Sequence, residues 1–218
     1  MAGGAAMSMP WMRMPGESWA AATASFVAIW TPMMVAMMLP SLVPMLHRYR
    51  VALVGRGAER LGVPMVVVAL GYFAVWSALG AVVFPLGAAL ASAELRLPVL
   101  AHMMPIASGV VVLIAGAVQL TRWKARHLAW DRAASAHVRT MPADVGTALR
   151  HGICLGVHCT YCCAGLTATL LALGVMDLRV MAGVTAAITA ERLAPAGARV
   201  VGVIGIVLGL FLVARAIA

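Results

Sequence analysis

The sequence predicts an all-α protein, a polytopic bundle of about six transmembrane helices. Its 218 residues are 63% hydrophobic and 11% charged, with a mean hydropathy of +0.98, whereas soluble chains carry about 25% charged residues. Apolar runs bounded by charged residues approach or exceed the length of about 20 residues that a helix needs to cross a bilayer. No linker is long enough to separate two bundles. We therefore expect one transmembrane domain over residues 19–218, after an extracytoplasmic methionine-containing tail over residues 1–18.

Charged residues mark the ends of the six predicted helices. The first helix contains Pro32, Pro40 and Pro44, which should kink it, as neighbouring helices allow in a membrane. The fifth is weak, because the uncharged stretch between Arg179 and Glu191 is only 11 residues long. Either this helix is short or tilted, or Glu191 lies below the surface against another helix. The predicted ranges are 20–46, 63–91, 98–121, 147–175, 178–193 and 198–217.

Basic residues divide unequally between the two sides of the predicted bundle. Of the 16 lysines and arginines, twelve lie in the segments 47–62, 121–151 and 191–199 and four lie on the opposite side. Because cytoplasmic loops are enriched in Lys and Arg, these segments are predicted to be cytoplasmic and both termini extracytoplasmic. The net charge of +9 does not indicate nucleic-acid binding, since the basic residues lie between apolar spans rather than along one face.

All four cysteines lie in one short segment that also contains two histidines. The segment reads HGICLGVHCTYCC, and thiolates and imidazoles are ligands for soft and borderline metal ions. On an ideal helix His151, Cys154, His158 and Cys162 share one face, while the remaining two cysteines point elsewhere. One helix cannot surround an ion, so other helices would have to complete the ligand set. The candidate ligands in this segment are His151, Cys154, His158, Cys159, Cys162 and Cys163.

Three other places offer partner ligands. The first helix carries a methionine cluster, and thioethers select Cu(I) but are also ordinary apolar filler. His127 and Asp131, four residues apart, suit either an ion bound from a continuation of the third helix or a solvated cytoplasmic face. Glu191 is a third candidate. Alternating methionines in the tail suggest either a weak Cu(I)-capturing segment or a tail without function. The methionines concerned are Met33, Met34, Met37 and Met38 in the helix, and Met7, Met9, Met12 and Met14 in the tail.

Several motifs together resemble the DUF2182 family, bacterial integral membrane proteins described as predicted metal-binding. The motifs are the AMMLPS segment within Trp30 to Pro44, GY-x3-W-x3-G from Gly71 to Gly80, Gln119-Leu120-Thr121 with Lys124, Gly152 to Cys163, Gly174-Val175-Met176, and Glu191-Arg192-Leu193 with Pro195 and Gly197. The resemblance implies a multi-pass protein of the bacterial cytoplasmic membrane. Where the family has two cysteines after QLTPLK, this chain has His127 and Asp131 in QLTRWKARHLAWDR, an exchange that favours borderline or harder ions.

These observations predict a membrane protein that binds a transition metal, with copper favoured over zinc. It would hold, relay or insert the ion as an accessory subunit of a membrane metalloenzyme, so its partners would be the lipid bilayer and other membrane subunits. One alternative is a thiol–disulfide protein using Cys159 and Cys162, although a partner thiol would have poor access at that depth. Another is a purely structural subunit whose small residues pack helices closely. No phosphate loop or hydrolytic residue set indicates an enzyme.

Overall fold

The computed structural model describes residues 11, 13, 16–54, 62–137, 144–194 and 196–217. In these segments the secondary structure is α-helical and includes no β-strand, which confirms the predicted all-α fold class. Most of the predicted tail, with Met7, Met9, Met12 and Met14, lies outside the described residues. The helices are α2 (Trp19–Val54), α3 (Gly62–Arg96), α4 (Pro98–Gln119), α5 (Arg122–His137), α6 (Val145–Leu173), α7 (Leu178–Leu193) and α8 (Gly197–Ile217).

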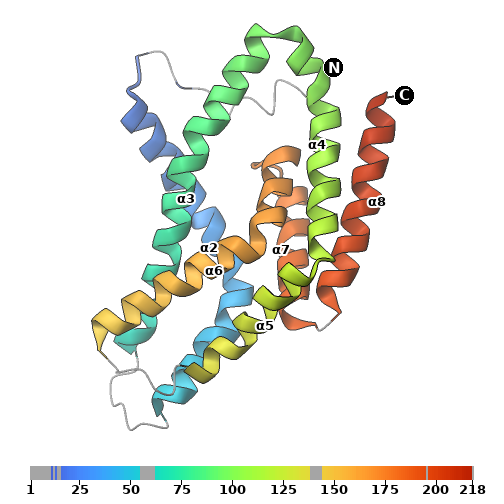
Figure 1. Cartoon of the computed structure of the whole chain (residues 1–218). Helices are drawn as coiled ribbons and strands as arrows, with labels where there is room; N and C mark the ends of the chain where they lie inside the picture. Colours follow the sequence, from blue (N-terminus) through green and yellow to red (C-terminus); the bar gives the residue numbers. More distant parts are fainter. Residues whose placement is uncertain are drawn as a thin grey trace.

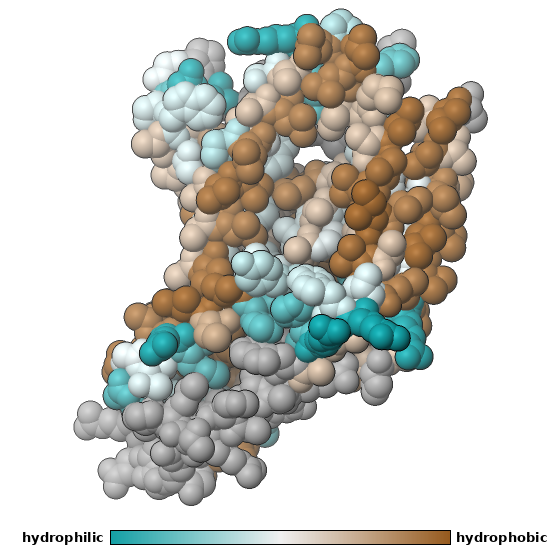
Figure 2. Space-filling view, viewed as in Figure 1, coloured by the Kyte–Doolittle hydropathy of each residue, from teal (hydrophilic) through white to brown (hydrophobic). Residues whose placement is uncertain are grey.

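Five of these helices, α2, α3, α4, α6 and α8, are long and apolar enough to span a membrane. Their surfaces carry large exposed hydrophobic side chains, and Figure 2 shows apolar side chains along α3, α4 and α8, with a hydrophilic belt across α5. α7 has 16 residues, fewer than the roughly 20 needed for a straight crossing. The fifth predicted helix therefore exists within its predicted bounds, and it is short.

Successive long helices run in opposite directions through the bundle (Figure 1). α3 and α4 are joined at the extended residue Leu97, and α6 ends at Gly174, whose φ of +127° is a conformation that favours glycine. α6 runs diagonally and packs on both α3 and α4, while α7 packs against α2, α6 and α8. This arrangement brings the middle of α6 next to the last turn of α7 and the first turns of α5.

α5 is a separate polar helix and not a continuation of α4. The chain breaks at Leu120 and Thr121, and the Thr121 hydroxyl accepts a hydrogen bond from the Lys124 backbone N–H at 3.3 Å. A threonine in this position caps a new helix. The third predicted helix was therefore two residues too long, and His127 lies on a separate helix and not on a continuation of the third one.

Asp144 caps the first turn of α6. Its carboxylate accepts a hydrogen bond from the Thr147 backbone N–H at 3.0 Å, and this interaction holds the pKa of the Asp144 carboxyl below its ordinary value. A carboxylate at a helix N-terminus also interacts favourably with the helix dipole. The cap fixes where α6 begins and hence the register of its cysteines.

Glycines allow α3 and α6 to approach at backbone distance. A Cβ added to Gly71 would lie 2.7 Å from the Leu149 carbonyl oxygen, and one on Gly156 would lie 2.8 Å from the Tyr72 carbonyl oxygen. Small residues four apart are the usual means by which membrane helices pack closely. The α3–α6 contact is therefore the rigid support of the cysteine segment.

Gly152→Ala is expected to destabilise the protein by about 1–3 kcal/mol, the range for overpacked cores. A Cβ at this position would overlap the backbone carbonyl of Val68, so α6 would have to move away from α3. Unfolding by sodium dodecyl sulfate titration, followed by circular dichroism, would measure the change. Gly183→Ala is the matched control, because nothing lies within 4 Å of the Cβ it would add. Equal stability of the two variants would contradict the close α3–α6 packing.

Candidate metal centre

Three of the four cysteines form a buried thiol cluster on α6, which we define as Cys159, Cys162 and Cys163. These side chains are 1%, 3% and 1% exposed, whereas Cys154 is exposed, and none of these four cysteines is in a disulfide bond. On an ideal helix Cys162 would share a face with Cys154 and point away from Cys159 and Cys163. The structure instead brings Cys159, Cys162 and Cys163 together, because α6 is covered on that side by other helices of the bundle.

Within the thiol cluster, Cys159 and Cys163 form the close pair. They lie one helical turn apart, and their Sγ atoms are 3.8 Å from each other. The Cys162 side chain also contacts that of Cys163. With metal–sulfur bonds of about 2.3 Å, an ion bridging the two Sγ atoms would have an S–metal–S angle of roughly 110°. That angle fits a trigonal or tetrahedral ion with at least one further ligand.

The Cys159 sulfur has donors from two other helices. The Arg192 guanidinium of α7 donates to Cys159 Sγ at 2.7 Å, and the Tyr72 hydroxyl of α3 donates to it at 2.9 Å. Arg192 also approaches Met45 Sδ of α2, at 3.5 Å. A guanidinium this close stabilises the negative charge that a cysteine must carry to bind a metal. Arg192 and Tyr72 were not predicted as site residues.

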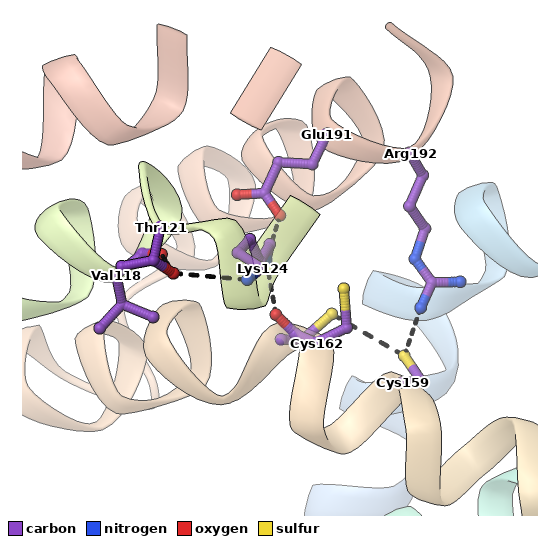
Figure 3. Close-up of polar contacts among 8 residues, drawn as sticks. Val118, Thr121, Lys124, Cys159, Cys162, Glu191 and Arg192 are labelled. Carbon is purple, nitrogen blue, oxygen red and sulfur yellow. Dashed lines mark hydrogen bonds and ion pairs between the residues drawn. The ribbon is translucent and has the colours of Figure 1, made fainter. Parts of the chain in front are cut away.

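A buried ion pair lies beside the thiol cluster (Figure 3). Lys124 Nζ of α5 is 2.6 Å from Glu191 Oε2 of α7, and these side chains are 1% and 2% exposed. Lys124 also donates to the Cys162 carbonyl oxygen at 2.5 Å. The alternative in which Glu191 lies below the surface against another helix is confirmed, and Glu191 pairs with Lys124. Its Oε1 atom has no hydrogen-bond partner in the described part of the chain.

The predicted methionine cluster of α2 is buried in the same core as the thiol cluster. Met34, Met37 and Met38 are at most 2% exposed, and Met33 is 8% exposed. They belong to one apolar cluster that also includes the three buried cysteines. α2 therefore places thioethers in the core that surrounds the thiols, where they serve as packing and are chemically suited to soft ions.

The two histidines of the cysteine segment, His151 and His158, have different neighbours. His158 lies 3.2 Å from His127, measured from Nε2 of the former to Nδ1 of the latter, so α5 and α6 bring together two predicted ligands. His151 instead stacks on Tyr49 of α2, with ring centroids 5.6 Å apart and an interplanar angle of 16°. The Asp131 side chain, which was predicted to act with His127, lies outside the described residues.

The ligand types therefore fall into separate pairs rather than one preformed cage. Among the residues that the structure describes, no group of three or more His, Cys, Asp or Glu side chains is placed to hold one ion. The thiol pair is soft and buried, while the histidine pair is borderline and half-buried. Lys124 and Arg192 could have been identified as site residues from the sequence, because each is a charged residue close to an otherwise apolar run.

Comparison with known proteins points to copper. Residues 27–214 match the family PpoB2, which is described as a copper chaperone; DUF2182 is not named in that match. No curated protein and no solved structure matches the chain. The family match includes all the cysteines, the α2 methionines, His127 and Glu191. Because it covers far more than half of the sequence, this chain belongs to the PpoB2 copper chaperone family.

Proposed function

We propose that the protein is an integral membrane copper chaperone that carries Cu(I) on its buried thiol cluster. The observation that carries the proposal is the Cys159–Cys163 pair, with Sγ atoms 3.8 Å apart beside the Arg192 guanidinium. Thiolates are soft ligands that favour soft ions such as Cu(I). Copper is here the cargo of the protein, taken up and given away again.

The spacing of the thiol pair suits an ion that remains exchangeable. Two thiolates at roughly 110° leave one side of the ion open to a third ligand. Cys162, which contacts Cys163, is one candidate from this chain, and Met34, Met37 and Met38 belong to the same core. A thioether of the α2 methionine cluster could offer its sulfur at that open position. Ligand replacement one bond at a time would then pass the ion without releasing it into water.

Charge balance explains why the thiol pair lies next to Arg192. Cu(I) on two thiolates has a net charge of −1, and the two thiol protons are released to solvent on binding. An uncompensated charge is costly in an apolar core, and the guanidinium at 2.7 Å from Cys159 offsets it. Lys124 and Glu191 already neutralise each other at 2.6 Å. With Cu(I) bound, the thiolates, Arg192 and the ion pair together would be neutral.

The proposal includes a membrane location. Five helices could cross a bilayer, and α7 would complete a sixth, shorter crossing if it is tilted or locally thins the bilayer. An even number of crossings agrees with both termini on the extracytoplasmic side, the orientation favoured by the twelve-to-four division of Lys and Arg. The resemblance to DUF2182 supports the cytoplasmic membrane of a bacterium. A membrane metalloenzyme that receives the copper is the partner we propose.

Copper stoichiometry of the purified, detergent-solubilised chain tests this function. Under anaerobic conditions, in competition with a chromophoric Cu(I) chelator, the wild-type chain is expected to retain a single tightly bound Cu(I). Cys159→Ser/Cys163→Ser is expected to lose it, because both bridging thiolates are gone. Cys154→Ser is the matched control, since this cysteine is exposed on the same helix, and it should retain the ion.

Two results would contradict the proposal. One is retention of Cu(I) by Cys159→Ser/Cys163→Ser at wild-type affinity. The other is a wild-type chain that binds no Cu(I) and instead traps a mixed disulfide through Cys159 or Cys162, which would favour thiol–disulfide exchange. The burial of these two thiols, 1% and 3% exposed, leads us to expect no such trapping.

A further inference from the structure

We infer that His127 and His158 form a second metal site, distinct from the thiol cluster, that takes a divalent borderline ion and binds Cu(II) most tightly. The two residues are 31 positions apart in the chain and come from different helices, yet His127 Nδ1 and His158 Nε2 face each other at 3.2 Å. Their ring centroids are 5.0 Å apart and their planes are inclined by 53°. Imidazole is a ligand for copper, zinc and nickel, and copper(II) binds most tightly of the divalent series.

The nitrogen–nitrogen distance fits a divalent ion bound by both imidazoles. With metal–nitrogen bonds of about 2.0–2.1 Å, a separation of 3.2 Å corresponds to an N–metal–N angle of roughly 100°. This angle lies between those of square-planar and tetrahedral coordination, which Cu(II) and Zn(II) adopt. Because imidazole is a borderline ligand and thiolate a soft one, the histidine pair suits a divalent ion and the thiol pair suits Cu(I).

Buried neighbours hold His127 in position. Lys124 and Leu128, which flank it on the inward face of α5, are 1% and 4% exposed. Trp123 packs against the His127 ring, with centroids 4.4 Å apart and an interplanar angle of 61°. Because α5 is anchored on both sides of His127, the imidazole is kept facing α6. Such preorganisation lowers the entropic cost of ion binding.

The histidine pair lies where an ion can enter from water. Both histidines are half-buried, and Arg122 and Arg126 on the outer face of α5 are exposed. Figure 2 shows the hydrophilic belt that α5 forms below the apolar surfaces of α3, α4 and α8. Two protein ligands leave the remaining positions to water or to a ligand from a partner. His158 directly precedes Cys159, so this open site borders the thiol cluster without sharing a ligand with it.

Electron paramagnetic resonance with Cu(II) tests the site. The protein used is Cys159→Ser/Cys163→Ser with the exposed Cys154 alkylated, so that the thiol pair cannot take or reduce the ion. This protein is expected to bind Cu(II) with hyperfine coupling to two imidazole nitrogens. His127→Gln and His158→Gln should each remove coupling to one imidazole and weaken binding by at least roughly tenfold. Helix content and gel-filtration profile of each variant establish that it is folded.

His151→Gln is the matched control, because His151 lies on the same helix and stacks on Tyr49 instead. It should leave the signal and the affinity unchanged. The inference is overturned if His127→Gln and His158→Gln bind Cu(II) as the parent protein does, or if His151→Gln weakens it equally, which would indicate adventitious binding. If the cysteine variant does not fold, Zn(II) binding to wild-type protein preloaded with Cu(I) replaces Cu(II) binding. The effects of His127→Gln, His158→Gln and His151→Gln on that Zn(II) binding then give the same comparison. A wild-type chain that binds Cu(II) at the histidine pair but binds no Cu(I) would overturn the proposed cargo function alone.

Discussion

Glu191→Leu is expected to destabilise the protein by about 3–5 kcal/mol, because it leaves the Lys124 ammonium buried without its counter-charge. Lys124 is 1% exposed, and its remaining partner is the Cys162 carbonyl oxygen. A carbonyl dipole offsets much less of the cost of burying a charge than a carboxylate at 2.6 Å does. The measurement is unfolding by sodium dodecyl sulfate titration of the purified protein, with the yield of monodisperse protein as a second readout.

The double substitution Lys124→Met/Glu191→Leu separates a charge effect from a packing effect. Removing both charges leaves no unpaired ion, and comparable replacements of buried ion pairs by apolar residues are neutral or stabilising. The double variant is therefore expected to recover most of the stability lost in Glu191→Leu, giving a large coupling energy in a double-mutant cycle. Glu94→Leu, at a half-buried carboxylate near the end of α3, is the matched control. A double variant no more stable than Glu191→Leu would show that the pair matters through packing alone.

The helices of this protein are predictable from its sequence for a physical reason. An apolar run bounded by charged residues has few alternatives to a helix of membrane length, and α3, α6 and α8 begin and end within a few residues of the predicted bounds. The end of the third helix was predicted two residues late, because the break between α4 and α5 rests on one local interaction, the Thr121 cap. Such a signal is small beside a continuous hydrophobic pattern.

The candidate site was predictable only in part. The cysteine segment stood out by its composition, but which cysteines meet is decided by the helices packed around α6. Arg192 reaches Cys159 from 33 residues away in sequence, and Tyr72 reaches it from 87 residues away. A single sequence carries no information on such pairings. A sequence does show where a charged residue lies close to an apolar run. Burial of Glu191 was one of two alternatives predicted on that ground.

The structure separates the thiol ligands from the imidazole ligands, which in the sequence form a single group of candidates. Cys159 and Cys163 are buried with a cation beside them, an environment for a soft monovalent ion in an apolar core. His127 and His158 lie where polar α5 meets α6, an environment for a borderline ion that keeps water ligands. The proposed histidine site would thus add to the thiol cluster without taking a ligand from it.

Arg192→Met is expected to weaken Cu(I) binding while leaving both thiols in place. Removing one partner of a buried, hydrogen-bonded charge pair costs about 2 kcal/mol or more, and because Arg192 is only half-buried the lower figure applies, roughly a thirtyfold loss of affinity. The reason is the residual charge of −1 on a bis-thiolate Cu(I) centre, which Arg192 would otherwise neutralise from 2.7 Å. Competition with a chromophoric chelator measures the affinity.

Arg192→Lys distinguishes charge from geometry, because lysine keeps the positive charge but not the planar fork that reaches Cys159 and Met45 together. It should recover part of the affinity lost in Arg192→Met. Arg199→Met, at an exposed arginine in the first turn of α8, is the matched control and should bind Cu(I) as the wild type does. If Arg192→Met also bound Cu(I) at wild-type affinity, the charge on the centre would have to be neutralised in another way. Retention of the proton on one thiol would be the first alternative. Cu(I) binding would then release one proton instead of two, and the fall of affinity per unit of decreasing pH would be half as steep.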